Sequence, residues 1–156
     1  MTTNNTSFSE VYDSFLSKVT DDMYMEMFPE EVQDILKDLL INAIPFFEFP
    51  KVDISSYNID VATFNTVLSQ EEINILATYM LVGWMSQQLA TVDNIRMKYS
   101  GQDFKFTSQA AHMKAISGIR DTYLKEGIHL QRLYNRRRKN AEGKIVSSFD
   151  SLMEMR

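Results

Sequence analysis

Apolar side chains recur at helical spacing along most of the chain. The first stripe follows a capping box formed by Ser7 and Glu10, and the second follows Pro29, a residue suited to the first position of a helix. Pro45 ends the second stripe. The pattern therefore predicts two amphipathic helices in the first 45 residues. Their apolar positions are Phe8, Val11, Tyr12, Phe15, Leu16 and Val19, then Val32, Ile35, Leu36, Leu39, Leu40 and Ala43.

The stretch from Ile73 to Val92 carries no charged residue, and a second capping box, Ser69 with Glu72, precedes it. A helix that is apolar on all sides is either the buried centre of a bundle or a membrane span. Its apolar middle, 75–85, is too short for a span, so we predict a buried central helix that runs to about Lys98. Its buried face is expected to hold Leu81, Met85, Leu89 and Val92.

A third apolar stripe keeps its phase through Gly127, although glycine often ends a helix. The spacing predicts one long helix from about Ser108 to Arg138, capped by Thr107 or Ser108. About 30 helical residues span about 45 Å, which is longer than a domain of this size needs for its own core. The stripe consists of Ala111, Ala115, Ile119, Tyr123, Leu130 and Tyr134.

Other segments break the helical pattern. Pro45 and Pro50 bracket three phenylalanines and predict an extended linker, with a short strand near Val52–Ile54. Residues 58–68 allow a short helix, and residues 99–106 alternate as in an extended piece or hairpin. The phenylalanines, together with Trp84 and Tyr79, are assigned to the core. A turn at 140–143 leads into a polar tail. Apolar anchors in the tail are Ile145, Val146, Phe149 and Leu152.

These elements predict an all-α fold. We expect a helical bundle of four or five helices around a buried central helix, with a minor extended or hairpin element and a C-terminal tail. The length of 156 residues is that of a single domain, residues 1–156. Its parts are the acidic N-terminal helices 1–49, a linker 50–68, the central and long C-terminal helices 69–138, and the tail 139–156.

Charge divides the chain into two unequal halves. Residues 1–72 hold 14 acidic and 3 basic residues, a net charge of −11, and residues 73–156 hold 7 acidic and 13 basic residues, a net charge of +6. Such polarity concerns association rather than fold. Two interpretations remain open: the acidic half packs against the basic half of the same subunit, or it meets the basic half of a neighbouring subunit.

Residue types needed for several kinds of chemistry are missing. The chain has no cysteine, and its two histidines lie 17 residues apart without paired carboxylates, so we expect neither a metal nor a cofactor. A phosphate-binding loop, a nucleophile elbow and paired catalytic carboxylates are also absent from the sequence. The first ten residues do not resemble a secretory signal. We therefore expect a soluble intracellular protein that is neither an enzyme nor attached to a membrane.

The candidate site is a basic cluster at the end of the last predicted helix, with two apolar anchors from the tail. Cations in the last turn suit the helix dipole, so a solvated cap is the simplest interpretation. Contact with phosphates, with Tyr134 stacked on a base, is the alternative expected of a nucleic-acid-binding regulatory protein. The third interpretation is docking onto an acidic protein surface. The candidate residues are Arg132, Arg136, Arg137, Arg138, Lys139, Phe149 and Leu152.

Two runs, LVGWMSQQLATVDNIRMKYSGQDFKFTSQAAHMKA (81–115) and LQRLYNRRRKN (130–140), resemble the small neck proteins of tailed bacteriophages, the head–tail connectors or adaptors. The resemblance covers about the C-terminal half. It implies a mostly helical protein without enzyme activity, located in the neck of the virion and in the host cytoplasm during assembly. Its implied partners are further copies of itself in a ring, the portal protein beneath the DNA-filled head, and another neck or tail-completion protein, with non-specific contact to packaged DNA. The acidic residues 1–49 depart from compact connector domains, so a stopper or tail-completion role stays open.

Overall fold

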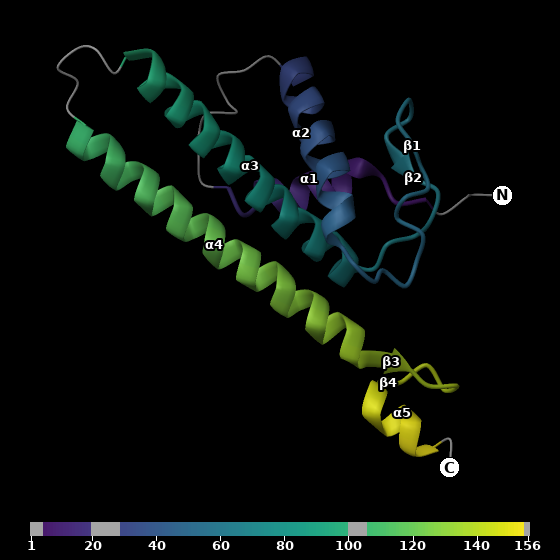
Figure 1. Cartoon of the computed structure of the whole chain (residues 1–156). Coiled ribbons are helices and arrows are strands. Elements are labelled where there is room, and N and C mark those ends of the chain that lie inside the picture. The colour runs from purple at the N-terminus through teal and green to yellow at the C-terminus, as the bar shows by residue number, and fades with distance from the viewer. Residues whose placement is uncertain (1–4, 20–28, 100–105, 155–156) are drawn as a thin grey trace.

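The computed structural model describes residues 5–19, 29–99 and 106–154, with side chains except at 92–99, 106–109, 151–152 and 154. These residues are mostly helical and form five α-helices and two small hairpins (Figure 1). The predicted helical fold is confirmed at this coarse level. The helices are α1 (Phe8–Leu16), α2 (Pro29–Ala43), α3 (Gln70–Tyr99), α4 (Phe106–Arg136) and α5 (Ser148–Glu154), with a 3-10 helix, η2 (Ile44–Phe46), after α2. The strands are β1 (Tyr57–Asn58), β2 (Thr63–Phe64), β3 (Arg137–Lys139) and β4 (Ile145–Ser147).

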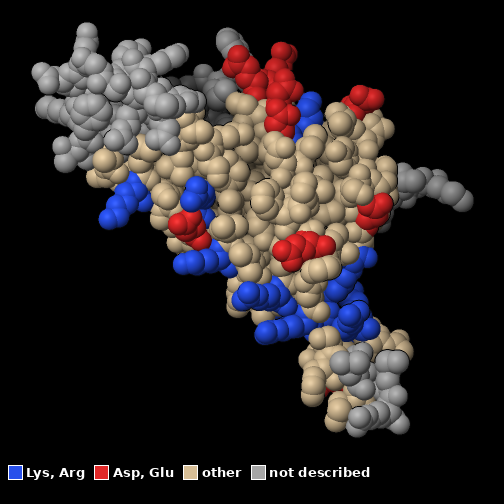
Figure 2. All heavy atoms as spheres, in the orientation of Figure 1, with Lys and Arg blue, Asp and Glu red and all other residues tan. Residues whose placement is uncertain are grey.

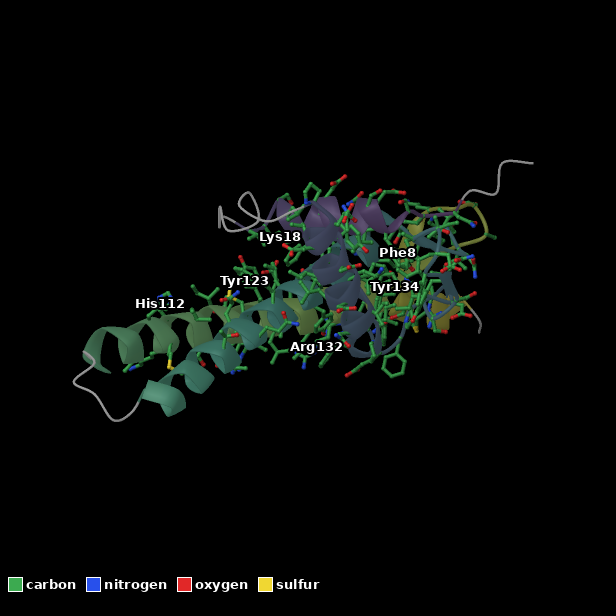
Figure 3. All side chains as sticks on the ribbon, turned by 90° about the horizontal axis from the view of Figure 1, so that it is seen from above. Phe8, Lys18, His112, Tyr123, Arg132 and Tyr134 are labelled. Carbon is green, nitrogen blue, oxygen red and sulfur yellow. The ribbon has the colours of Figure 1, made fainter. Side chains whose placement is uncertain are left out.

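The two long helices, α3 and α4, lie side by side and run in opposite directions (Figure 1). Helices α1 and α2 pack against α3 on the side away from α4. Seen from above, Phe8 and Tyr134 lie toward one end of the molecule and His112 lies toward the other (Figure 3). One end of the α3–α4 pair therefore extends beyond the layer that α1 and α2 form.

Both N-terminal helices begin as the sequence predicts. The amide of Ser9 donates to Ser7 Oγ, and the amide of Ser7 donates to Glu10 Oε1, which completes the first capping box. Pro29 is the first residue of α2. The buried faces consist of Phe8, Val11, Tyr12 and Phe15 in α1, and Leu36, Leu39, Leu40 and Ala43 in α2.

The predicted start of α3 is also confirmed. The amide of Ser69 donates to Glu72 Oε2 over 2.7 Å, and the amide of Glu72 donates to Ser69 Oγ over 3.3 Å. Burial along α3 is uneven, because the helix is buried as far as Trp84 and becomes half-buried or exposed after it. Of the predicted buried face, Leu81 is 1% exposed, Met85 and Leu89 are half-buried, and the side chain of Val92 lies outside the described set.

Helix α4 runs unbroken through Gly127, as the period of its apolar residues predicts. It begins before Thr107 and Ser108, so the prediction that one of them caps it is wrong. The apolar stripe is buried only at its end: Tyr134 is buried, while Tyr123 and Leu130 are half-buried. The first three stripe residues face solvent in the subunit, and these are Ala111, Ala115 and Ile119.

The segment between α2 and α3 departs from two predictions. No strand forms at Val52–Ile54 and no helix forms in residues 58–68; instead β1 and β2 pair, with Tyr57 opposite Phe64. Both of these rings pack against Phe8, with centroids 5.9 and 4.9 Å away. Because Phe8 is far away in sequence, the local pattern of this segment did not reveal the hairpin.

The residues before α1 extend this hairpin. The amide of Phe64 donates to the carbonyl of Thr6 over 2.9 Å, and the amide of Thr6 donates to the carbonyl of Thr66 over 3.2 Å. The hydroxyl of Thr6 accepts the amide of Leu68 over 2.8 Å. Thr6 thus fixes the residues immediately before α1 to the segment that leads into α3.

Two further expectations concern the aromatic residues and the loop after α3. Phe47 and Phe64 belong to the core, but Phe46 and Phe49 are exposed, so the assignment of all the phenylalanines to the core is wrong. Tyr99 and Phe106 are helical, and the extended piece predicted between them falls at 100–105, outside the described residues.

In the described part of the chain, no helix has the length and hydropathy that a bilayer span requires.

Candidate protein-docking surface

Three of the predicted site residues, Arg137, Arg138 and Lys139, form strand β3 rather than the last turn of α4. They pair with β4, so that Arg138 lies opposite Val146. The prediction that the helix continues to Arg138 is therefore wrong. The physical reason is the turn at 140–144, which brings β4 back beside β3 and supplies hydrogen-bond partners to a strand at these positions.

Asn140 and Gly143 shape that turn. The side-chain oxygen of Asn140 accepts the amides of Glu142 and Lys144 over 3.1 and 2.9 Å. Gly143 has φ +78°, a conformation that favours glycine. An asparagine followed three residues later by glycine was visible in the sequence, and it is the signal that predicts this turn correctly.

Helix α5 continues from β4 and packs against α4, β3 and β4. Ser147 Oγ accepts the amide of Phe149 over 3.2 Å and caps the helix. We call residues 137–154 the C-terminal element; it extends away from α1, α2 and α3 (Figure 1). Phe149 is 69% exposed and Met153 is 63% exposed, so the element presents apolar side chains to solvent. Leu152 lies within α5, but its side chain is outside the described set.

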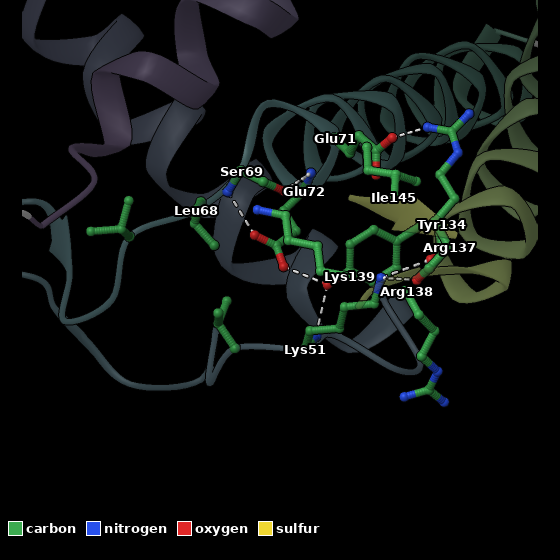
Figure 4. Close-up of a pocket in the computed structure, with 12 residues that line it drawn as sticks. Lys51, Leu68, Ser69, Glu71, Glu72, Tyr134, Arg137, Arg138, Lys139 and Ile145 are labelled. Atoms are coloured by element: carbon green, nitrogen blue, oxygen red, sulfur yellow. Dashed lines mark hydrogen bonds and ion pairs between the residues drawn. The ribbon is translucent and has the colours of Figure 1, made fainter. Parts of the chain in front are cut away.

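A groove of about 550 Å³ separates the C-terminal element from the segment before α3 (Figure 4). Cationic and apolar side chains together line most of it, and we call it the basic groove. The cationic residues are Lys51, Arg137, Arg138 and Lys139. The apolar residues include Val52, Val67, Leu68 and Ile145. Glu71, Glu72 and Tyr134 complete the side formed by α3 and α4.

Tyr134 connects the two sides of the basic groove. Its hydroxyl donates to Glu72 Oε1, and it accepts the backbone amide of Lys51 over 2.8 Å. Burial, followed by donation to Glu72, raises the pKa of Tyr134 well above its usual value of about 10. The hydroxyl therefore stays protonated at neutral pH and holds α4 against the start of α3.

Lys51 is held over the same ring. Its ammonium lies 4.1 Å from the centroid of Tyr134 and donates to the carbonyls of Tyr134 and Arg137 over 3.0 and 2.6 Å. These carbonyls lie at the end of α4 and the start of β3, where a cation also suits the helix dipole. Loss of hydration lowers the pKa of Lys51 from its ordinary value. Lys51 therefore has a structural role at the junction of α4 and β3.

Gln131 fixes the neighbouring turn of α4. Its amide nitrogen donates to Tyr79 Oη and, over 2.8 Å, to the carbonyl of Phe46. Its side-chain oxygen accepts the amide of Glu48 over 2.8 Å. Burial raises the pKa of Tyr79. Together, Gln131 and Tyr134 attach the segment after α2 to the last two turns of α4.

The ion pairs bear on how the two charged halves of the chain meet. Among the described residues, three ion pairs form, and only Glu71 with Arg137 joins residues 1–72 to residues 73–156. Figure 2 shows acidic side chains over α2 and basic side chains along α4 and at its C-terminal end. In the described part of the subunit, the acidic side chains of α2 therefore form no ion pair with residues 73–156.

The predicted site residues divide into three groups. Arg137, Arg138 and Lys139 line the basic groove, whereas Arg132 and Arg136 are exposed on α4 outside it. Phe149 is exposed on α5 and does not line the groove either. The pattern of the sequence did not indicate that Lys51, Glu72, Tyr134 and Gln131 hold the basic groove together. The one available signal was Gln131, a polar residue on the apolar face of α4.

The described residues include no group of three or more histidine, cysteine, aspartate or glutamate side chains that could hold a metal ion. No protein-family model, curated protein or solved structure matches the chain.

Proposed function

We propose that this protein is a structural component of the neck of a tailed bacteriophage, a head–tail connector that forms a ring and joins the portal of the DNA-filled head to the tail. The C-terminal element is the observation that carries the proposal. It extends from the end of α4, exposes Phe149 and Met153, and lies beside the basic groove. Apolar anchors next to cations are the side chains that a protein-docking surface needs.

The resemblance of residues 81–115 and 130–140 to neck proteins supports the same proposal. In that family the C-terminal segment reaches onto the portal, and we propose the same role for residues 137–154. The proposed location is the virion neck, after assembly in the host cytoplasm. The proposed role is structural and involves no catalysis.

The ring gives a reason for the uneven burial of the long helices. We propose that α3 becomes a buried central helix only in the assembled ring, where a neighbouring subunit covers its second half. The same neighbour would cover the exposed apolar residues on the first half of α4. Ile119, which is 46% exposed in the subunit, belongs to this stripe.

A nucleic-acid-binding regulatory protein remains the second candidate. Arg132, Arg136, Arg138 and Lys139 are exposed and have no ion pair with any described residue, so they are free to contact phosphates. The other part of this hypothesis is wrong, because Tyr134 is 3% exposed and hydrogen-bonded and does not offer its ring for stacking on a base. The structure therefore favours docking of a protein over reading of a nucleic acid.

Replacement of both exposed anchors, Phe149→Ser with Met153→Ser, tests the proposed docking. We expect the variant to keep its melting temperature, because exposed side chains contribute little to stability. We expect its affinity for DNA-filled heads with an open portal to fall by about tenfold or more, as is usual when apolar interface anchors are lost. Co-sedimentation with such heads measures the affinity.

The matched control removes two apolar side chains of similar exposure from the turn between β1 and β2, Ile59→Ser with Val61→Ser. This variant should bind filled heads as the parent does. Equal attachment of both variants would contradict the proposal. Salt-sensitive binding of the parent to free DNA, without attachment to heads, would favour the second candidate.

A further inference from the structure

The first turns of α2 carry a one-sided set of exposed carboxylates, which we call the acidic face: Glu30, Glu31, Asp34 and Asp38. Glu30, Asp34 and Asp38 are each four residues apart, and like charges at this spacing repel each other on a helix. Lys37 pairs with Asp34 over 3.2 Å and is the only cation in an ion pair with this face among the described residues. The carboxylate of Asp34 nevertheless remains 75% exposed.

The basic groove has the opposite imbalance. Arg137 pairs with Glu71, and Lys51 is engaged with backbone carbonyls, but Arg138 and Lys139 have no ion pair with any described carboxylate. Both side chains are exposed. The groove is open beside them, and its apolar lining includes Val67 and Ile145, which are 55% and 62% exposed.

The two surfaces cannot neutralise each other within one subunit. The acidic face occupies the first three turns of α2, and the basic groove, which Lys51 and Val52 help to line, lies beyond the C-terminal end of that helix (Figures 1 and 2). A contact between two copies removes the excess charge of both surfaces at once. Because the two surfaces differ, such a contact is heterologous, and it leaves one face and one groove unused at the ends of any open chain.

We propose that the basic groove binds the acidic face of α2 from a second copy of this chain. In this contact Arg138 and Lys139 pair with Glu31 and Asp34 of the neighbouring copy. The inference deepens the proposed ring-forming function and rests on it, because it names the two surfaces through which neighbours meet. Repetition of the contact closes a ring when the rotation between subunits divides a full turn.

Crosslinking through single cysteines tests this contact, since the full-length chain has no cysteine of its own. Glu30→Cys marks the acidic face, Ile145→Cys marks the groove, and Asp121→Cys is a control at an exposed carboxylate on α4. With a short thiol crosslinker, a mixture of the first two variants should give a linked dimer. A mixture of Asp121→Cys with Ile145→Cys should not. High salt should reduce the yield by about tenfold, because the contact is electrostatic.

Charge reversal supplies the second arm. Reversal of the charges in either crosslinking partner should abolish the linked dimer. The first partner then carries Glu31→Lys with Asp34→Lys, and the second carries Arg138→Glu with Lys139→Glu. Both reversals present together, one in each partner, should restore it. Three results would overturn the inference. They are retention of the linked dimer after reversal in one partner alone, crosslinks that form only between two copies of the same cysteine variant, and a yield that does not depend on salt.

Attachment of the parent to filled heads, measured beside the crosslink, separates this inference from the proposed function. Attachment of the parent to heads without the crosslink would refute the contact and leave the docking role standing. A crosslink without any attachment to heads would support the contact between copies and count against the neck assignment.

Discussion

The two carboxylate oxygens of Glu72 accept hydrogen bonds from different parts of the chain. Oε2 accepts the amide of Ser69 and closes the capping box of α3, while Oε1 accepts the hydroxyl of Tyr134 from α4. A carboxylate that is 3% exposed needs such partners, because an unpaired buried charge is strongly unfavourable. One residue thus begins α3 and places the end of α4, and with it the basic groove.

Because of Tyr12, the stability of the subunit decreases at alkaline pH. Burial, followed by the nearby charge of Asp38, raises the pKa of Tyr12 to about 12, whereas an unfolded tyrosine ionises near pH 10. Between these values the unfolded chain binds fewer protons than the folded one, so the free energy of unfolding falls as pH rises. Below about pH 10 the stabilisation is fully present.

Replacement of this residue, Tyr12→Phe, removes that dependence. We compare the unfolding free energies of the variant and the parent at pH 7 and at pH 11. Between these two pH values, the difference should shift in favour of the variant by about 1.4 kcal/mol. Chemical denaturation at the two pH values measures the change. Parallel pH profiles of the parent and the variant would show that the hydroxyl of Tyr12 is not perturbed by the fold.

Some of these residue roles were predictable from the sequence and others were not. Both capping boxes connect residues three positions apart, so their hydrogen bonds are visible in the local pattern. The contacts of Tyr134 with Lys51 and Glu72 join positions 83 and 62 residues apart. No periodicity carries that information. The sequence therefore indicates only that Tyr134 belongs to the apolar stripe of the last helix and leaves stacking on a base open as an alternative.

At the scale of the elements, α4 passes closely over α3 at one point. Gly127 is buried there, and a Cβ at this position would lie 3.0 Å from Cζ of Tyr79. That ring stacks on Phe46, with centroids 5.6 Å apart, and its hydroxyl is held by Gln131. A glycine within the helix is therefore explained by the close approach of the Tyr79 ring, and it does not end the helix.

Two glycines of α4 provide a matched pair of substitutions. An added Cβ at Gly118 would meet no atom within 4 Å, so Gly118→Ala should stabilise the protein by about 0.5–1 kcal/mol through helix propensity. The same change at Gly127 must displace the ring of Tyr79, and we expect Gly127→Ala to be destabilised relative to Gly118→Ala by about 1–3 kcal/mol. Urea unfolding measures both, and equal stabilisation would refute the close contact.

Long helices were the most predictable elements of the fold, because repeated spacing identifies them independently of their partners. The short hairpins were not predicted. The turn between β1 and β2 depends on packing of Tyr57 and Phe64 against Phe8, and β3 depends on pairing with β4. The sequence therefore identified three of the four cationic residues of the basic groove, Arg137, Arg138 and Lys139, but placed them at the end of a helix rather than along the wall of a groove.

At the scale of the whole molecule, the core is concentrated in one part of the chain. Every buried hydrophobic side chain of the described residues except Tyr134 lies between Phe8 and Trp84. Helix α4 otherwise packs through half-buried side chains, such as Tyr123, Leu124 and Leu130. Its last turns are fixed by hydrogen bonds, whereas no side chain of residues 110–120 is buried in the subunit.

Hydrogen exchange should reveal this difference in the isolated subunit. Amides in residues 110–120 of α4 should exchange through local opening, at a lower free energy than amides in α1 and the first half of α3. Native-state exchange at low denaturant concentrations measures these free energies. Uniform protection along the whole of α4 would contradict the expectation, and an increase in protection upon assembly would agree with the proposed ring.

The attachment of Thr6 to the segment after β2 also affects how the chain is made. The hydroxyl of Thr6 accepts the amide of Leu68, which is 62 residues further along. At synthesis rates of about 5–20 residues per second, about 3 to 12 seconds pass between the addition of these two residues. During that time the apolar face of α1, including Phe8 and Phe15, has no hairpin or α3 to cover it. The nascent chain therefore exposes these apolar side chains until the start of α3 has emerged.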